Sequence, residues 1–243
     1  MLANSLARTL SVLGLSVWVI CGVIIGQILA SILIVSLPFA LHGTVEATAS
    51  AALGYLFALS IVVALPLIIR KHKADFTQLG LYRLPSWSDI GLGLLSVLPY
   101  FLLASALLWL GTDILHIINP EVGQQISFSN LHSRGEYILA FFTLVVIAPF
   151  AEEFLFRGYF QGAVMKRAGK IAGILVVAAV FGLFHLPGFT EQGVVWQWGA
   201  AADTFSLGII AGMLRLLTGS IWAGMILHAL KNGIAYYFLF IAR

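Results

Sequence analysis

The chain has 243 residues, of which 60% are hydrophobic and only 9% are charged. A typical soluble domain is about 45–50% apolar and about 25% charged, so a soluble fold of this length could not cover its surface with so few charges. The mean hydropathy of +1.02 agrees. The composition predicts an all-α, polytopic bundle of transmembrane helices, and it excludes nucleic-acid binding, secretion and intrinsic disorder.

The net charge of +3 and the single cysteine limit the remaining chemistry. Basic residues of a membrane protein mostly set its topology and contact lipid headgroups, so the charge does not indicate an acidic partner. Cys21 can form neither an intramolecular disulfide nor a zinc site built from several thiolates. Because it lies in an apolar run, we interpret it as a small packed hydrophobe.

The apolar runs predict about seven spans (six to eight) within one membrane domain, residues 1–243, because a helical span needs about 20 apolar residues. The predicted spans are Leu10–Ala40, Ala47–Ile69, Ile90–Gly111, a span from about Tyr137 that charged residues interrupt, Ile171–Leu186, about Val194–Leu214, and Gly219–Ala242.

The basic residues between these spans are distributed unevenly, which predicts an N-terminus in the cytoplasm and a C-terminus on the opposite side. The predicted cytoplasmic segments contain Arg8, Arg70, Lys71, Lys73, Arg83, Lys166, Arg167, Lys170 and Arg215, whereas the opposite side has Arg134 and Arg243. With few lysines and much Ala, Leu and Ile, the composition favours a prokaryotic plasma (inner) membrane.

Several ionisable or amide side chains fall inside the predicted spans, where a charge costs about 2.5–3.5 kcal/mol on insertion scales. Such residues normally face a protein interior or a water-filled cavity. They are Glu152, Glu153, Arg157, His185, His228 and Asn232, while the depth of Asp203 and Lys231 is left open.

Glu153 and Arg157 are four residues apart, so they share a helix face and can form an ion pair. This pair could serve structure alone or take part in an active site. Glu152 lies about 100° further round the helix, and the residue four positions later is Phe156, which cannot neutralise it. An unpaired carboxylate beside a paired one is the arrangement expected of a general base.

His228 and Asn232 also share one helix face, four residues apart. At 1.5 Å per residue, Glu152, His185 and Asn232 lie about 20–22 Å from the predicted cytoplasmic ends of their helices. His228 lies about 14 Å from that end. Residues from three spans therefore converge on one layer of the membrane.

Three segments resemble the motifs of the CPBP family, which includes CAAX prenyl endopeptidases and bacterial Abi-type intramembrane proteases. Glu152–Gly158 (EEFLFRG) resembles the EExxxR motif, Phe181–His185 (FGLFH) the FxxxH motif, and His228–Asn232 (HALKN) the HxxxN-type motif. Each motif alone is weak, but the ordered set is specific. The resemblance covers roughly residues 80–242.

The resemblance implies an intramembrane endopeptidase with a catalytic core at about residues 137–242. Glu152 would be the general base that activates water, assisted by His185, and His228 and Asn232 would donate hydrogen bonds to the oxyanion. Glu153 and Arg157 would be supporting residues or substrate contacts. The favoured mechanism needs no cofactor. The alternative is a divalent metal such as zinc, for which Glu152, His185 and His228 could supply ligands.

Two other functions stay open at this point. A non-proteolytic membrane scaffold, immunity factor or regulator could use the same core through contacts alone. A proton-coupled transporter could use buried carboxylates and histidines as a relay, although neither an inverted repeat nor paired broken helices are visible in the sequence. The expected partners are the lipid bilayer and a membrane-associated peptide or protein substrate, which a prenyl group could modify.

Overall fold

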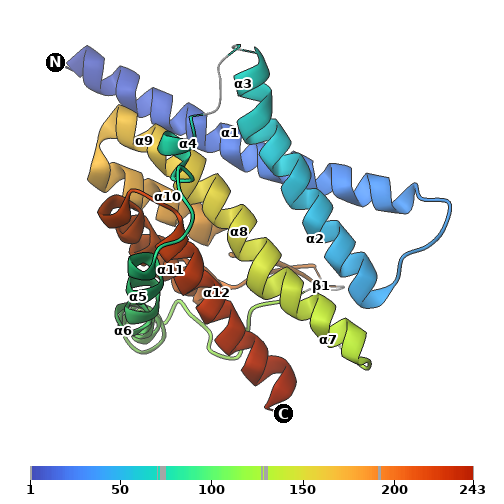
Figure 1. Ribbon diagram of the computed structural model, residues 1–243. Helices are drawn as coiled ribbons and strands as arrows, with labels where there is room; N and C mark the ends of the chain where they lie inside the picture. The colour runs from blue at the N-terminus through green and yellow to red at the C-terminus, as the bar shows by residue number, and fades with distance from the viewer. Residues whose placement is uncertain are drawn as a thin grey trace.

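A computed structural model of the protein describes residues 2–69, 71, 75–126, 128, 131–190 and 193–242. It confirms the predicted all-α bundle, with one short hairpin (Figure 1). The helices, π-helical segments (η) and strands are α1 (Leu2–Val35), α2 (Gly43–Leu59), η1 (Ser60–Ala64), α3 (Leu65–Ile69), α4 (Phe76–Leu79), α5 (Trp87–Leu95), α6 (Val97–Trp109), η2 (Leu110–Ile114), α7 (Arg134–Phe141), η3 (Phe142–Ile147), α8 (Ala148–Glu153), η4 (Phe154–Phe160), α9 (Gln161–Ala168), α10 (Lys170–Phe184), β1 (Pro187–Thr190), β2 (Gly193–Trp196), α11 (Trp198–Thr218), α12 (Trp222–Tyr236) and η5 (Tyr237–Ile241).

Within the described residues, six helical stretches are long and apolar enough to cross a membrane, and α10 is a shorter apolar helix. These seven correspond in order to the seven predicted spans. The six are Leu6–Val35, Gly43–Ile69, Trp87–Ile114, Arg134–Ala168, Trp198–Thr218 and Trp222–Ile241. The first ends at Val35 rather than near Ala40, because Pro38 cannot continue a helix and disfavours helical geometry just before it.

The predicted sixth span began too early. Residues 193–196 form β2, which pairs antiparallel with β1 so that Pro187 lies opposite Trp196 and Thr190 opposite Gly193. The Val-Val-Trp run is apolar, but β-branched and aromatic residues also favour strands. The Gln197 N–H donates to the Leu186 carbonyl at 2.7 Å, which closes the base of the hairpin. The helix itself begins only at Trp198.

The helix that carries the predicted acids runs without a break from Arg134 to Ala168. It begins with a capping box, in which the Ser133 hydroxyl accepts from the Glu136 N–H and the Glu136 carboxylate accepts from the Ser133 N–H. Two π-helical segments, η3 and η4, flank α8. Pro149, in the first turn of α8, has no N–H to donate, and the wider turns of η3 precede it. π-helical turns are rare and occur frequently at functional sites.

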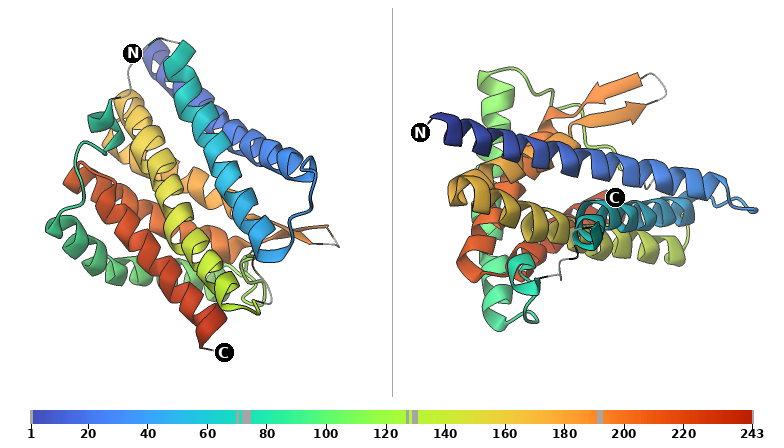
Figure 2. Two further views of the ribbon diagram at one scale, coloured as in Figure 1. Left: turned by 45° about the vertical axis from the view of Figure 1, so that its right-hand side comes forward. Right: turned by 90° about the horizontal axis from the view of Figure 1, so that it is seen from above.

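The N-terminal helices α1 and α2 form an antiparallel pair that packs on the α7–α9 helix, and α12 packs on the same helix from the other side (Figures 1 and 2). The pair α10 and α11 lies behind these helices, and α5–α6 packs on α11 and α12. Small residues bring α1 and α2 together. A Cβ atom at Gly26 would lie 2.6 Å from the Ala58 backbone nitrogen, so only glycine fits there.

The basic segments gather at one end of the bundle. The Lys166 ammonium donates to the Gln78 side chain, and Arg167 donates to the Ser11 hydroxyl at 2.8 Å. Arg215 donates to the Gln78 carbonyl at 2.8 Å. These contacts place the segments that the charge asymmetry assigned to one side of the membrane at a single end. Three residues used in that assignment, Arg70, Lys73 and Arg243, lie outside the described residues.

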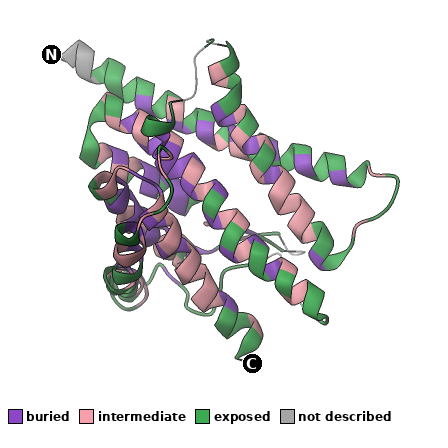
Figure 3. Ribbon diagram, in the orientation of Figure 1, coloured by how far each residue is buried: buried purple, intermediate pink, exposed green. Residues whose placement is uncertain are grey.

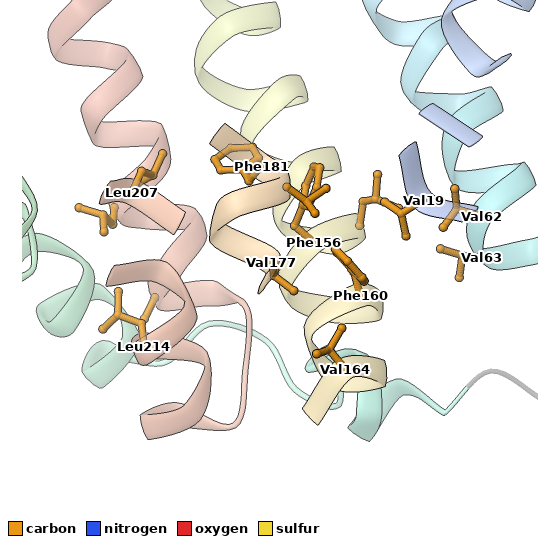
Figure 4. Packing of buried hydrophobic residues seen from close by; sticks show 14 of the residues in the cluster. Val19, Val62, Val63, Phe156, Phe160, Val164, Val177, Phe181, Leu207 and Leu214 are labelled. Carbon is orange, nitrogen blue, oxygen red and sulfur yellow. The ribbon is translucent and has the colours of Figure 1, made fainter. Parts of the chain in front are cut away.

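The core is the region where α1, η1, η4, α10 and α11 meet. In the view of Figure 4, Val19 and Val62 lie on one side of Phe156 and Phe160, and Leu207 lies on the other. Exposed apolar side chains cover the outward faces of the bundle, α1 included, as expected for helices that contact lipid (Figure 3). Cys21 is exposed on α1, so our interpretation of it as a packed hydrophobe is wrong.

Candidate functional site

The two adjacent glutamates form the last turn of α8 and lie in different environments. The Glu153 side chain is fully buried, whereas the Glu152 side chain keeps 13% of its surface exposed. Because consecutive helical residues are about 100° apart, one carboxylate faces the neighbouring helices and the other faces a cavity. The two carboxylates therefore differ in their access to the cavity, while their roles stay a prediction.

The predicted pair of Glu153 and Arg157 is present and fully buried. Arg157 Nη1 lies 3.1 Å from Glu153 Oε1, and neither side chain has exposed surface. The guanidinium carbon also lies 4.5 Å from the centre of the Phe181 ring, which is a cation–π distance. The pair therefore joins the acidic helix to α10 in the centre of the bundle.

His228 lies between the two glutamates. Its Nδ1 is 3.2 Å from Glu153 Oε1, and its Nε2 is 3.7 Å from Glu152 Oε2. The imidazole is buried and also contacts the Phe181 ring edge to face. The structure thus brings α12 to the acidic helix at His228, with Glu153 Oε1 beside its Nδ1.

Tyr55 of α2 contacts Glu152, and sequence reasoning did not identify it. The phenol donates to Glu152 Oε1 at 2.5 Å. Tyr55 lies in an apolar span among small residues, where a tyrosine resembles any other packed aromatic. The one signal in the sequence was a phenol deep in a membrane span, because a buried tyrosine hydroxyl needs a hydrogen-bond partner.

His185 follows the last residue of α10 and faces the same cavity as Glu152. Its Nδ1 lies 3.0 Å from the Phe181 carbonyl, a contact that orients the ring. The ring also packs edge to face on Phe181. With Nδ1 held in this way, Nε2 is the nitrogen available to a ligand in the cavity.

The hydrogen bond of Asn232 goes to a backbone carbonyl and not to either glutamate. Its side-chain nitrogen donates to the Leu144 carbonyl of η3 at 2.8 Å. The Ala148 N–H bonds the Thr143 carbonyl, but the next residue, Pro149, has no N–H to donate to the Leu144 carbonyl. Asn232 donates to that carbonyl instead and joins α12 to η3. Neither Asn232 nor His228 is among the described residues that line the cavity.

The cavity beside Glu152 has a volume of about 1000 Å³ and lies between α1, α2, α8 and the end of α10. Most of its lining is apolar, and its polar groups come from α1, α2, α8 and the end of α10. These are Gln27, Glu46, Ser50, Tyr55, Glu152 and His185. A second cavity of about 530 Å³ is lined by Gln124, Gln125 and Gln197 and shares His185 and Phe184 with the first.

The three residues considered as metal ligands, Glu152, His185 and His228, are not assembled into an ion site in the structure. Among the described residues, no group of three His, Cys, Asp or Glu side chains is arranged to hold an ion. His228 Nδ1 faces Glu153, and His185 Nδ1 faces a backbone carbonyl. Each imidazole therefore presents Nε2, with its other nitrogen held by a carbonyl or carboxylate as in many metal-ligating histidines. We derive no chemical step through a metal.

Lys231 and Asp203, whose depth the sequence left open, form a separate polar group. Lys231 Nζ lies 2.9 Å from Asp203 Oδ2, and Tyr100 of α6 donates to Asp203 Oδ1. The two charged side chains keep 13% and 23% of their surface exposed. This group joins α6, α11 and α12 and is distinct from the pair at Glu153 and Arg157.

Residues 134–234 match the family model described as type II CAAX prenyl endopeptidase, Rce1-like. All three motifs lie within the matched segment, and the match confirms the resemblance to the CPBP and CAAX protease family. It is narrower than the expected range, because it begins at residue 134 and not near residue 80. No curated protein and no solved structure matches the chain. The chain is an integral membrane protein, and its residues 134–234 are similar to the CAAX prenyl endopeptidase family.

Proposed function

We propose that the protein is an intramembrane endopeptidase in which Glu152 activates the water that hydrolyses a peptide bond. One observation carries the proposal: Glu152 and His185 face the same cavity of about 1000 Å³, inside a segment that matches CAAX prenyl endopeptidases. The catalytic core is the region of about residues 137–242. Helices α1 and α2 supply the opposite wall of the cavity.

In the proposed reaction, Glu152 takes a proton from water while the water oxygen attacks the carbonyl carbon of the scissile bond. The carbonyl oxygen becomes the oxyanion of a tetrahedral intermediate. When the oxyanion collapses and the carbon–nitrogen bond breaks, the proton passes from Glu152 by way of His185 Nε2 to the leaving amine nitrogen, and Glu152 is a carboxylate again. General acid–base help of this kind contributes about 10²–10⁴-fold in rate.

The proposed oxyanion donors are His228 and Asn232. The His228 ring is already oriented, because Nδ1 is 3.2 Å from Glu153 Oε1 and Nε2 faces Glu152. Asn232 bonds the Leu144 carbonyl, so its donation to an oxyanion requires that bond to be exchanged when substrate binds. An oxyanion donor is typically worth about 2.7–4 kcal/mol of barrier. Glu153 supports this arrangement because its Oε1 contacts His228 Nδ1, and Arg157 pairs with Glu153.

The proposed substrate is a membrane-associated peptide or protein segment. The mostly apolar lining of the cavity suits an apolar chain, and a prenylated C-terminal CAAX peptide is one member of that class. The polar groups along α2 suit the backbone of a peptide. A leader peptide or a membrane-protein segment fits the same description.

Cleavage of a peptide library by the purified protein tests the proposal. The wild-type protein should release new peptide termini, and Glu152→Gln should lower the rate by at least about 10²-fold without unfolding the protein. Glu121→Gln is the matched control, because Glu121 is exposed and is not among the described residues that line either cavity. Equal cleavage by wild type and Glu152→Gln would contradict the proposal.

The same assay tests the absence of a metal requirement. We expect cleavage to survive dialysis against a chelator. Loss of cleavage that added Zn²⁺ restores would replace the metal-free mechanism with a metal-dependent one. A cellular phenotype that persists when Glu152 and His185 are both replaced would favour a scaffold or regulatory role instead.

A further inference from the structure

The contact between Tyr55 and Glu152 joins a residue outside the segment that matches the family model to a residue inside it. Glu152 lies within residues 134–234, whereas Tyr55 lies on α2, outside the matched segment. The phenol donates to Oε1 at 2.5 Å, and Oε2 of the same carboxylate faces His228. The two oxygens of the proposed base thus have different partners, contributed by different helices.

Helix α2 contacts the acidic helix at two levels. The hydroxyl oxygens of Thr48 and Thr143 lie 3.1 Å apart, and Tyr55 contacts Glu152 further along. Thr48 and Tyr55 are seven residues apart and therefore lie on the same face of α2. Both contacts join α2 to the same partner helix, but only the second reaches the proposed base.

The surroundings of Tyr55 fix the position of its ring. Gly54 and Ala58 beside it pack against α1, since a Cβ atom at Gly54 would lie 2.3 Å from Gln27 Oε1 and Ala58 meets Gly26. The Gln27 side-chain nitrogen also donates to the Ser50 hydroxyl at 2.9 Å. With α2 held between α1 and the acidic helix, the phenol has a fixed approach to the carboxylate.

We propose that Tyr55 is a positioning residue that holds the Glu152 carboxylate in its reactive orientation. The proposal rests on the proposed function of Glu152 as the base. The phenol occupies Oε1, so the carboxylate cannot rotate freely about its last bond, and Oε2 stays turned toward His228 and the proposed water. Without the phenol, the carboxylate also samples other orientations. It then spends a smaller fraction of its time in the orientation that can take the proton from water.

Tyr55→Phe removes the donor and keeps the ring. Because a hydrogen bond to a charged group is stronger than one between neutral groups, kcat should fall by about tenfold or more. KM should change by less than about twofold, because the cavity keeps its shape. Thr48→Val is the matched control. It removes a hydroxyl from the same face of the same helix, and kcat should stay within about twofold of wild type.

A second comparison separates positioning from a general structural effect. In Glu152→Asp the carboxylate is one methylene shorter and withdrawn from the phenol. Tyr55→Phe added to this variant should change kcat by less than about twofold, whereas a purely structural effect would be as large as in the wild-type background. Should Tyr55→Phe not fold, Tyr55→Met offers a flexible apolar side chain of similar volume for the same kcat and KM comparison.

The outcomes distinguish the two proposals. Cleavage that depends on Glu152 but is unchanged in Tyr55→Phe overturns the role of Tyr55 and leaves the proposed function standing. Equal losses of kcat in Tyr55→Phe and Thr48→Val also overturn it, because α2 would then act only as a packing element. Cleavage that does not depend on Glu152 overturns the proposed function itself.

Discussion

Single residues carry the buried charge of this protein. In the bundle centre, Glu153 and Arg157 have no exposed surface, and Glu153 Oε2 and the guanidinium nitrogens have no hydrogen-bond partner among the described residues. Arg157 therefore depends on Glu153 and on the ring of Phe181 beside it, while Glu153 Oε1 also faces His228 Nδ1. Removing one partner of such a pair leaves an uncompensated charge, which costs more than the pair contributes.

The first prediction concerns this pair. Arg157→Met should lower the free energy of unfolding by about 3–5 kcal/mol, because Glu153 would remain buried without a cation. Lys231→Met is the control, since the pair of Lys231 and Asp203 is partly exposed and should matter less. Unfolding in mixed micelles, followed by circular dichroism, measures both. An equal loss in the two variants would contradict this account.

Residues within one helix were predicted well from the sequence, and contacts between helices were not. The spacing of four between Glu153 and Arg157 fixes a shared face, so the pair could be read directly from the sequence. The contact of Tyr55 with Glu152 spans 97 positions, and the bond of Asn232 to Leu144 uses a carbonyl of a π-helical segment. No local pattern specifies either contact.

At the scale of helices, the pair α1 and α2 forms the wall opposite the candidate site. The close approach depends on Gly22 and Gly26, whose Cβ atoms would lie 2.3 Å from a Val62 methyl and 2.6 Å from the Ala58 nitrogen. Small residues let membrane helices approach, and van der Waals packing then stabilises the contact. The lengths of the apolar runs predicted the order of the helices. They did not predict the hairpin, because a short apolar run is compatible with a strand or a helix.

The second prediction tests this contact. Gly26→Leu should force α1 and α2 apart and destabilise the protein by about 1–3 kcal/mol, as overpacking does. Gly14→Leu lies on the same helix, and a Cβ atom there meets nothing within 4 Å, so it should be tolerated. Thermal unfolding in detergent measures the difference. Similar melting temperatures for the two variants would contradict the packing described for α1 and α2.

For the whole molecule, the basic residues define one end. Lys166, Arg167 and Arg215 are joined there by hydrogen bonds to Gln78 and Ser11. The charge asymmetry predicted this grouping because cytoplasmic loops of membrane proteins are rich in lysine and arginine. The grouping follows from the fold, whereas the side of the membrane on which it lies stays a prediction.

The third prediction concerns that side. The test uses Glu121→Cys in a Cys21→Ser background. Residue 121 lies between the third and fourth predicted spans, in the same loop as Arg134, on the side opposite the predicted cytoplasmic segments. The new cysteine should therefore react with an impermeant maleimide in right-side-out membrane vesicles. A cysteine at Lys170 should react only after the vesicles are opened. The reverse pattern of labelling would mean that the N-terminus lies outside.

The most direct test of the central claim is peptide hydrolysis in ¹⁸O-labelled water. If Glu152 activates water inside the bundle, the wild-type protein should yield cleaved peptide whose new carboxylate contains one ¹⁸O atom, and Glu152→Gln should yield no product above background. Folded wild-type protein that releases no product from any membrane peptide, or Glu152→Gln that yields as much labelled product as wild type, would contradict the account.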